Sequence, residues 1–128
     1  MSYKKLLVIT LWLIAGHSIG VGFGMVVFPT NWIAFFDIVP SEHRFFITQG
    51  GVFHIIMAIA YGTAAYNITE SNQLITFSII VKFCAASFLF LYFIFINQFG
   101  IVFISGIGDF CMGLVLMVVY KKYQQEFS

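Results

Sequence analysis

The 128-residue sequence is poor in charge: 9% of its residues are Asp, Glu, Lys or Arg, whereas 61% are hydrophobic. Together with a mean hydropathy of +1.00, this excludes an ordinary soluble domain, in which about 25% of residues are charged. The formal net charge is +1, and the basic residues form no long run. A nucleic-acid-binding protein needs a basic patch, so nucleic acid is not expected as a partner.

Cysteine is scarce as well. The two cysteines, Cys84 and Cys111, lie inside apolar stretches and do not form a CxxC motif. The lack of that motif argues against a membrane thiol oxidoreductase. Both are interpreted as small hydrophobic packing residues, which is how most buried cysteines behave.

The chain contains long apolar runs. A membrane-spanning helix needs about 20 apolar residues, and the runs of that length are Leu6–Phe28, Phe45–Tyr66, Leu74–Ile96 and Phe99–Tyr120. Residues 1–128 are therefore predicted to form one all-α transmembrane domain, an up-down bundle of four helices. The first run begins like a signal peptide, but it exceeds the core of about 7–15 residues that such peptides have, so we expect a retained span.

A short interfacial helix is predicted between the first two spans, over Asn31–Val39. Its apolar side chains Trp32, Phe35 and Phe36 recur at helical spacing, and Pro29 separates them from the first span. An amphipathic helix of this kind lies in the plane of the membrane surface, where Trp and Phe are common anchors.

Positive charge at the span ends predicts the orientation. Lys4 and Lys5 precede the first span and Lys121 and Lys122 follow the last, whereas Arg44 lies on the opposite side. Since lysine and arginine concentrate on the cytoplasmic side, both termini are predicted to be cytoplasmic. The expected location is a bacterial cytoplasmic membrane.

Small residues mark faces where helices can pack closely. Gly16, Gly20 and Gly24 recur at intervals of four, a pattern that lets a neighbouring backbone approach in lipid. Gly50 and Gly113 lie on the small, polar faces of the second and fourth spans. Packing within the bundle is favoured over dimerisation for the first stripe, and the other two glycines are assigned to the same role.

Each span carries an ionisable residue near its middle: His17, His54, Lys82 and Asp109. An ionised side chain at the centre of a bilayer costs several kcal/mol unless it is paired or hydrated. Because all four lie at similar depth, they could meet inside one bundle as a midplane polar cluster. We expect Lys82 and Asp109 to pair.

The cluster has three interpretations. The first is a buried polar network that fixes helix packing, and the second is proton or substrate handling, since histidine titrates near neutral pH. The third and weakest is haem ligation by His17 and His54. No metal or cofactor is otherwise expected; a bound quinone is left open.

The pattern resembles the DoxX-like group of small four-helix membrane proteins. The matching features follow a glycine-rich first span: Phe28-Pro29, Arg44, Gly50-Gly51, Val81-Lys82-Phe83 and Gly108-Asp109. The resemblance implies the four-helix membrane fold. It also implies a possible association with membrane quinol oxidation or redox complexes, as for some members of that group.

The function expected from these features is that of a non-catalytic accessory subunit, or of a bundle that binds lipid or quinone, within a larger membrane complex. No nucleophile and base are arranged as in an enzyme, so catalysis is not expected. The alternative is a proton-coupled carrier of small molecules, or a small membrane enzyme, that uses the midplane polar cluster. Expected partners are membrane lipid and either other subunits or a second copy of the chain.

Overall fold

The computed structural model describes residues 2–29, 31–32 and 44–126. Within these residues the long helices are α1 (Tyr3–Val27), α3 (Arg44–Tyr66), α4 (Asn72–Phe95) and α5 (Gly100–Glu126). Each is long and apolar enough to cross a membrane, by length and composition. The prediction of an all-α protein with four candidate membrane spans is confirmed, and the chain is a small integral membrane protein.

The helices extend beyond the ends of the predicted spans where polar residues follow or precede the apolar run. Helix α5 runs to Glu126 and not to Tyr120, because lysine, glutamine and glutamate are good helix formers outside an apolar run. Helix α1 begins at Tyr3, directly after Ser2, whose hydroxyl accepts a hydrogen bond from the backbone N–H of Lys5 at 3.4 Å. Serine at this position caps the first turn.

The predicted interfacial helix Asn31–Val39 lies, beyond its first two residues, outside the described part of the chain, and so do its anchors Phe35 and Phe36. Trp32 is described: its side chain is 58% exposed, and its ring centroid lies 5.6 Å from that of Phe28. The interfacial helix therefore stays a prediction.

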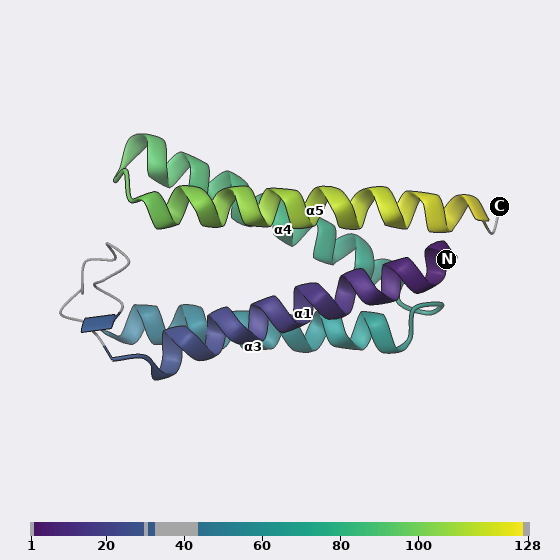
Figure 1. Cartoon of the computed structure of the whole chain (residues 1–128), viewed down its shortest axis with the longest axis horizontal. Helices are drawn as coiled ribbons and strands as arrows, with labels where there is room; N and C mark the ends of the chain where they lie inside the picture. The colour runs from purple at the N-terminus through teal and green to yellow at the C-terminus, as the bar shows by residue number, and fades with distance from the viewer. Residues whose placement is uncertain (1, 30, 33–43, 127–128) are drawn as a thin grey trace.

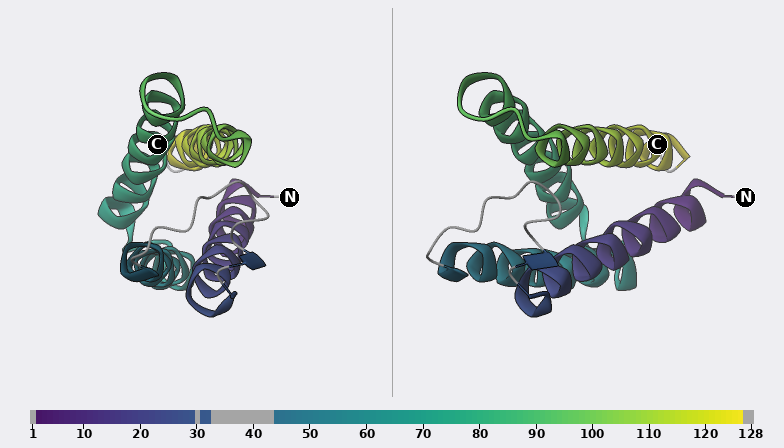
Figure 2. Two further views of the ribbon diagram at one scale, coloured as in Figure 1. Left: turned by 90° about the vertical axis from the view of Figure 1, so that its left-hand side faces the viewer. Right: turned by 60° about the vertical axis from the view of Figure 1, so that its left-hand side comes forward.

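The helices form two antiparallel hairpins, α1 with α3 and α4 with α5, and the closest contacts are within these pairs. Figure 1 shows the two hairpins side by side, with both chain termini at the same end. The hairpins come together near the termini and diverge towards the opposite end, as the further views in Figure 2 also show.

The shared hydrophobic core lies at the end where the hairpins converge. It is built from the first half of α1, the second half of α3, the start of α4 and the end of α5, and its residues include Leu7, Leu11, Ile14, Tyr61, Ala64, Ala65, Ile75, Leu116, Val119 and Tyr123. Because successive helices run in opposite directions, these segments occupy the same end of the bundle. One half of the molecule therefore has a four-helix core.

Glycines bring the two helices of each hairpin close together. A Cβ atom added to Gly22 would lie 2.6 Å from the backbone oxygen of Gly51, so the backbones of α1 and α3 are in direct contact there. In the other hairpin, an added Cβ on Gly106 would lie 2.9 Å from the ring of Phe90. Glycine is needed at these positions because the partner helix fills the space of a side chain.

The predicted packing stripe of α1 behaves differently. A Cβ atom added to Gly16 or Gly20 would meet nothing within 4 Å, and one added to Gly24 would approach Phe28 of the same chain segment. The buried face of α1 carries Gly22 instead. The stripe at intervals of four lies on another side of the helix, so it does not pack inside the described bundle.

Polar contacts join the ends of the α1–α3 hairpin and of the whole chain. Arg44 donates hydrogen bonds to the carbonyl oxygens of Val26 at 3.0 Å and Phe28 at 2.8 Å, which would otherwise be unpaired at the end of α1. The carboxylate of Glu126 accepts the backbone N–H of Tyr3 at 3.2 Å. The end of α5 is thereby fastened to the start of α1.

Candidate functional site

Lys82 and Asp109 form a buried ion pair between α4 and α5. The Lys82 Nζ atom lies 2.7 Å from Asp109 Oδ1, and the side chains are 3% and 11% exposed. The pairing expected from the sequence is therefore present. Its two formal charges cancel, which makes burial of both groups tolerable in an apolar environment.

Neighbouring residues hold this lysine in place. Gly113, one turn after Asp109, leaves room for the Lys82 stem: an added Cβ at Gly113 would lie 3.1 Å from Lys82 Cβ. The Lys82 ammonium group also lies over the ring of Tyr61 from α3, 5.5 Å from its centroid. A cation over an aromatic face is attracted to it, so the ion pair connects the two hairpins through Tyr61.

Gly50, predicted to serve helix packing like Gly113, also approaches another helix. A Cβ atom added to it would lie 2.9 Å from the terminal methyl group of Met25 in α1. Of the glycines assigned to packing from the sequence, Gly50 and Gly113 face a neighbouring helix.

The two histidines lie on the other hairpin. His17 of α1 is exposed and His54 of α3 is half-buried. His54 lies at the contact of α3 with α1: its Cβ atom would be 3.0 Å from a Cβ atom added to Gly22. Of the four midplane residues, the structure thus pairs Lys82 with Asp109 on one hairpin, and the two imidazoles belong to the other hairpin.

Neither histidine forms a hydrogen bond or ion pair with another described residue, whereas Lys82 and Asp109 satisfy each other. An imidazole carries a donor and an acceptor on its ring, and a polar group without a partner is costly in hydrocarbon. The ring atoms of His17 and His54 are therefore available to water, lipid or a bound molecule.

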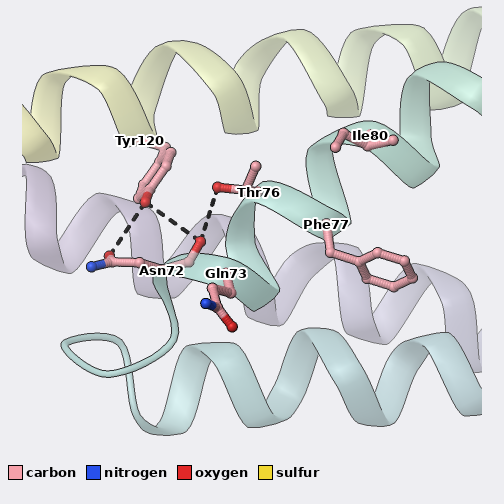
Figure 3. Close-up of a pocket in the computed structure, with 6 residues that line it drawn as sticks. All are labelled: Asn72, Gln73, Thr76, Phe77, Ile80 and Tyr120. Atoms are coloured by element: carbon pink, nitrogen blue, oxygen red, sulfur yellow. Dashed lines mark hydrogen bonds between the residues drawn. The ribbon is translucent and has the colours of Figure 1, made fainter.

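A shallow groove of about 360 Å³ opens on the outside of α4 and α5, lined by Asn72, Gln73, Thr76, Phe77, Ile80 and Tyr120. Figure 3 shows the hydroxyl of Tyr120 directed at Asn72. This hydroxyl donates a hydrogen bond to Asn72 Oδ1 at 3.3 Å. Thr76 donates to the backbone oxygen of Asn72 at 2.9 Å. The lining has no charged side chain, and its polar groups tie α4 to α5.

Among the described residues, no group of three or more His, Cys, Asp and Glu side chains is placed to hold a metal ion. Cys84 and Cys111 are exposed free thiols. The chemistry of the candidate site therefore rests on the midplane polar cluster.

Two features of this site were not singled out from the sequence. Tyr61 lies two turns after His54 on the same side of α3, a spacing that predicts a shared face but not a ring beneath Lys82. The contact of Gly22 with Gly51 could not be predicted from the sequence, because neither glycine belongs to the regular pattern of small residues at intervals of four. Both depend on the rotation of a partner helix.

Comparison of the chain with protein-family models, with curated proteins and with solved structures gave no match in any of the three.

Proposed function

We propose that this protein is a non-enzymatic membrane bundle that binds an amphipathic membrane molecule between its hairpins, next to His17 and His54, as an accessory component of a larger membrane complex. The observation that carries the proposal is the pair of imidazoles at mid-span without partners among the described residues. A polar group at that depth favours any molecule that brings a hydrogen-bonding group into the membrane.

The distribution of the core supports this function. At the terminus end, side chains from all four helices fill the interior. The Lys82 side chain lies at the edge of that core, over Tyr61, and towards the end distant from the termini the hairpins diverge (Figure 1). A ligand with an apolar body and a polar head would match surroundings that are apolar except for the two rings.

The resemblance to DoxX-like proteins belongs to this proposal and suggests which ligands to test first. Membrane quinones carry carbonyl acceptors that an imidazole N–H can reach, and phospholipids carry ester and phosphate acceptors. Haem ligation by the two histidines is the easiest variant to exclude: purified protein without a Soret absorption band would end it.

The test is to extract the protein into polymer-bounded nanodiscs without detergent and to identify the retained lipids, quinones and proteins by mass spectrometry. We expect a small molecule retained in near-stoichiometric amount and lost in His54→Ala. Phe53→Ala is the matched control, because Phe53 is adjacent in α3 but 59% exposed. Equal retention in both variants, or no enrichment over bulk lipid, would contradict the proposal.

A second function is favoured by one further observation. Each of the four long helices in the described part of the chain carries one of the titratable residues His17, His54, Lys82 and Asp109, and two of these already pair between α4 and α5 at 2.7 Å; titratable groups inside a membrane often form the proton path of a carrier. In proteoliposomes, a proton-driven flux abolished by His17→Ala and by Asp109→Asn in folded protein would favour the carrier over the accessory bundle.

A further inference from the structure

The groove on the outside of α4 and α5 changes from polar to apolar along α4. We propose that it binds one anionic phospholipid, with the phosphate group beside Asn72 and Lys121 and an acyl chain over Phe77 and Ile80. This goes beyond the proposed function, because the groove belongs to one hairpin and the ligand proposed above lies between the two. The polar lining residues are Asn72, Gln73, Thr76 and Tyr120, and the apolar ones are Phe77 and Ile80.

The polar part of the groove lies at the end of the bundle that carries both chain termini (Figure 1). Helix α4 begins there with Asn72, and its apolar run follows. Ile80 comes eight residues after Asn72, which is about 12 Å farther along the helix. The headgroup region of one leaflet is about 5–7 Å thick. The groove is therefore long enough to contact a headgroup and the start of an acyl chain.

The shallowness of the groove suits a lipid better than a soluble ligand. Its volume of about 360 Å³ is at the low end of the range for small-molecule sites, about 300–1,000 Å³. A soluble ligand in such a site needs most of its surface buried by protein. A phospholipid does not, because the surrounding bilayer covers the part of the acyl chain that the protein leaves exposed. Phe77 and Ile80 are themselves exposed and give that chain an apolar surface.

Hydrogen bonds in the groove fix the orientation of the Asn72 amide. The hydroxyl of Tyr120 donates to Asn72 Oδ1 at 3.3 Å, and the hydroxyl of Thr76 donates to the backbone oxygen of Asn72 at 2.9 Å. In Figure 3 the amide nitrogen of Asn72 is turned away from Tyr120. This nitrogen carries donors and no acceptor. It is therefore suited to a phosphate oxygen, which accepts hydrogen bonds.

Lys121 supplies positive charge beside the groove. It directly follows Tyr120 and is exposed. It also comes eleven residues after Phe110, or about three helical turns, so both lie on the same side of α5. That side adjoins α4, because the rings of Phe110 and Phe83 are 5.7 Å apart. Lys122 lies about 200° around the helix from Tyr120 and so points to the opposite side of α5.

The balance of charge at this end also favours an anionic ligand. The carboxylate of Glu70 accepts a hydrogen bond from Asn67 at 2.7 Å, and that of Glu126 accepts one from the backbone N–H of Tyr3 at 3.2 Å. Basic residues at a membrane surface attract anionic lipid, by about fivefold in affinity for each lysine. The exposed lysines at this end are Lys4, Lys5, Lys121 and Lys122.

Native mass spectrometry of the full chain in detergent tests the proposal. The protein is titrated with phosphatidylglycerol or with phosphatidylcholine that has the same acyl chains, so that the ratio of the two dissociation constants reports the effect of headgroup charge. We expect phosphatidylglycerol to bind about fivefold more tightly. Lys121→Gln should abolish this preference. Lys122→Gln is the matched control, because it removes the same charge from the other side of α5 and should keep the preference.

Thr76→Trp tests the groove itself, because an indole ring at this position would fill it. This variant should lose the first, saturable binding of both lipids. Thr63→Trp is its control, since Thr63 is an exposed residue of α3 whose hydroxyl also donates to the carbonyl oxygen four residues earlier. Circular dichroism reports whether each variant is folded, and the comparison of the two lysine variants stands without Thr76→Trp.

Three results would overturn the proposal: no preference for phosphatidylglycerol in the wild type, an equal loss of preference in Lys121→Gln and Lys122→Gln, or unchanged lipid binding in folded Thr76→Trp. An equal loss would mean that the lysines act through the general surface potential. His54→Ala should leave the preference unchanged, so this test can fail or succeed independently of the proposed function.

Discussion

The ion pair of Lys82 with Asp109 gives the sharpest test of how this bundle is held together. At 2.7 Å and an effective dielectric constant of about 20, two unit charges attract each other by about 6 kcal/mol. Burying the two ions costs several kcal/mol each, so the net contribution of the pair is small. Removing one partner strands a charge and should destabilise the fold by about 3–5 kcal/mol.

Replacing both partners should cost far less than the sum of the single changes. Lys82→Met and Asp109→Leu keep similar volume while removing the charge, and the double variant is expected to match or exceed the wild type in stability. The free energy of unfolding is measured by titrating a denaturing detergent into mixed micelles and following helical circular dichroism.

An asymmetry between the single variants follows from Tyr61. In Asp109→Leu, the stranded ammonium group keeps the ring of Tyr61 at 5.5 Å, an interaction of about 0.5–2 kcal/mol. In Lys82→Met, the stranded Asp109 carboxylate has no comparable stabilising contact with another described residue. Lys82→Met should therefore be the more damaging change. Single effects that add to the double effect within about 0.5 kcal/mol would refute the energetic coupling of the pair.

Further outcomes are expected elsewhere in the bundle. Gly22→Ala should destabilise the fold by about 1–3 kcal/mol, because its Cβ would lie 2.6 Å from a backbone oxygen of α3. Gly20→Ala has open space around it and should be neutral or slightly stabilising in the same unfolding assay. Arg44→Ala should cost about 1 kcal/mol by freeing the last carbonyls of α1, with Arg44→Lys restoring part of that loss. Cysteines placed at Ser2 and Asn97 should react with an impermeant thiol reagent from opposite sides of the membrane, and labelling from the same side would contradict the four-span topology.

The number of spans and the pairing of Lys82 with Asp109 could be predicted from the sequence, because both follow from the properties of the lipid bilayer that surrounds the helices. Apolar length alone sets the spans, and the cost of an isolated charge predicts that Lys82 finds Asp109. The ends of the helices were less accessible. Beyond Tyr120 the chain turns polar, which ends an apolar run but does not end a helix, so α5 continues to Glu126.

Helix rotation could not be derived in the same way. In water, the apolar face of a helix identifies its buried side, but lipid is as apolar as leucine and gives no such signal. The remaining signal is small and polar residues, and α1 presents two candidates. The regular stripe of Gly16 and Gly20 faces open space, whereas Gly22 meets Gly51. Choosing between them requires the position of α3.

The hairpins diverge because of the side-chain volumes of residues that face one another on different helices. This pattern is not visible along the sequence of any single helix. At the terminus end, Ala15, Ala64 and Ala65 are small enough to let α1 and α3 accept side chains from α4 and α5. At the other end, the phenylalanines of α4 and α5 pack on one another, and Gly22 draws α1 onto α3. Packing there is satisfied inside each hairpin, so nothing among these contacts pulls the hairpins together. The Lys82–Asp109 pair lies beside this change in packing, because it joins α4 to α5 while Lys82 also contacts Tyr61, a residue of the shared core.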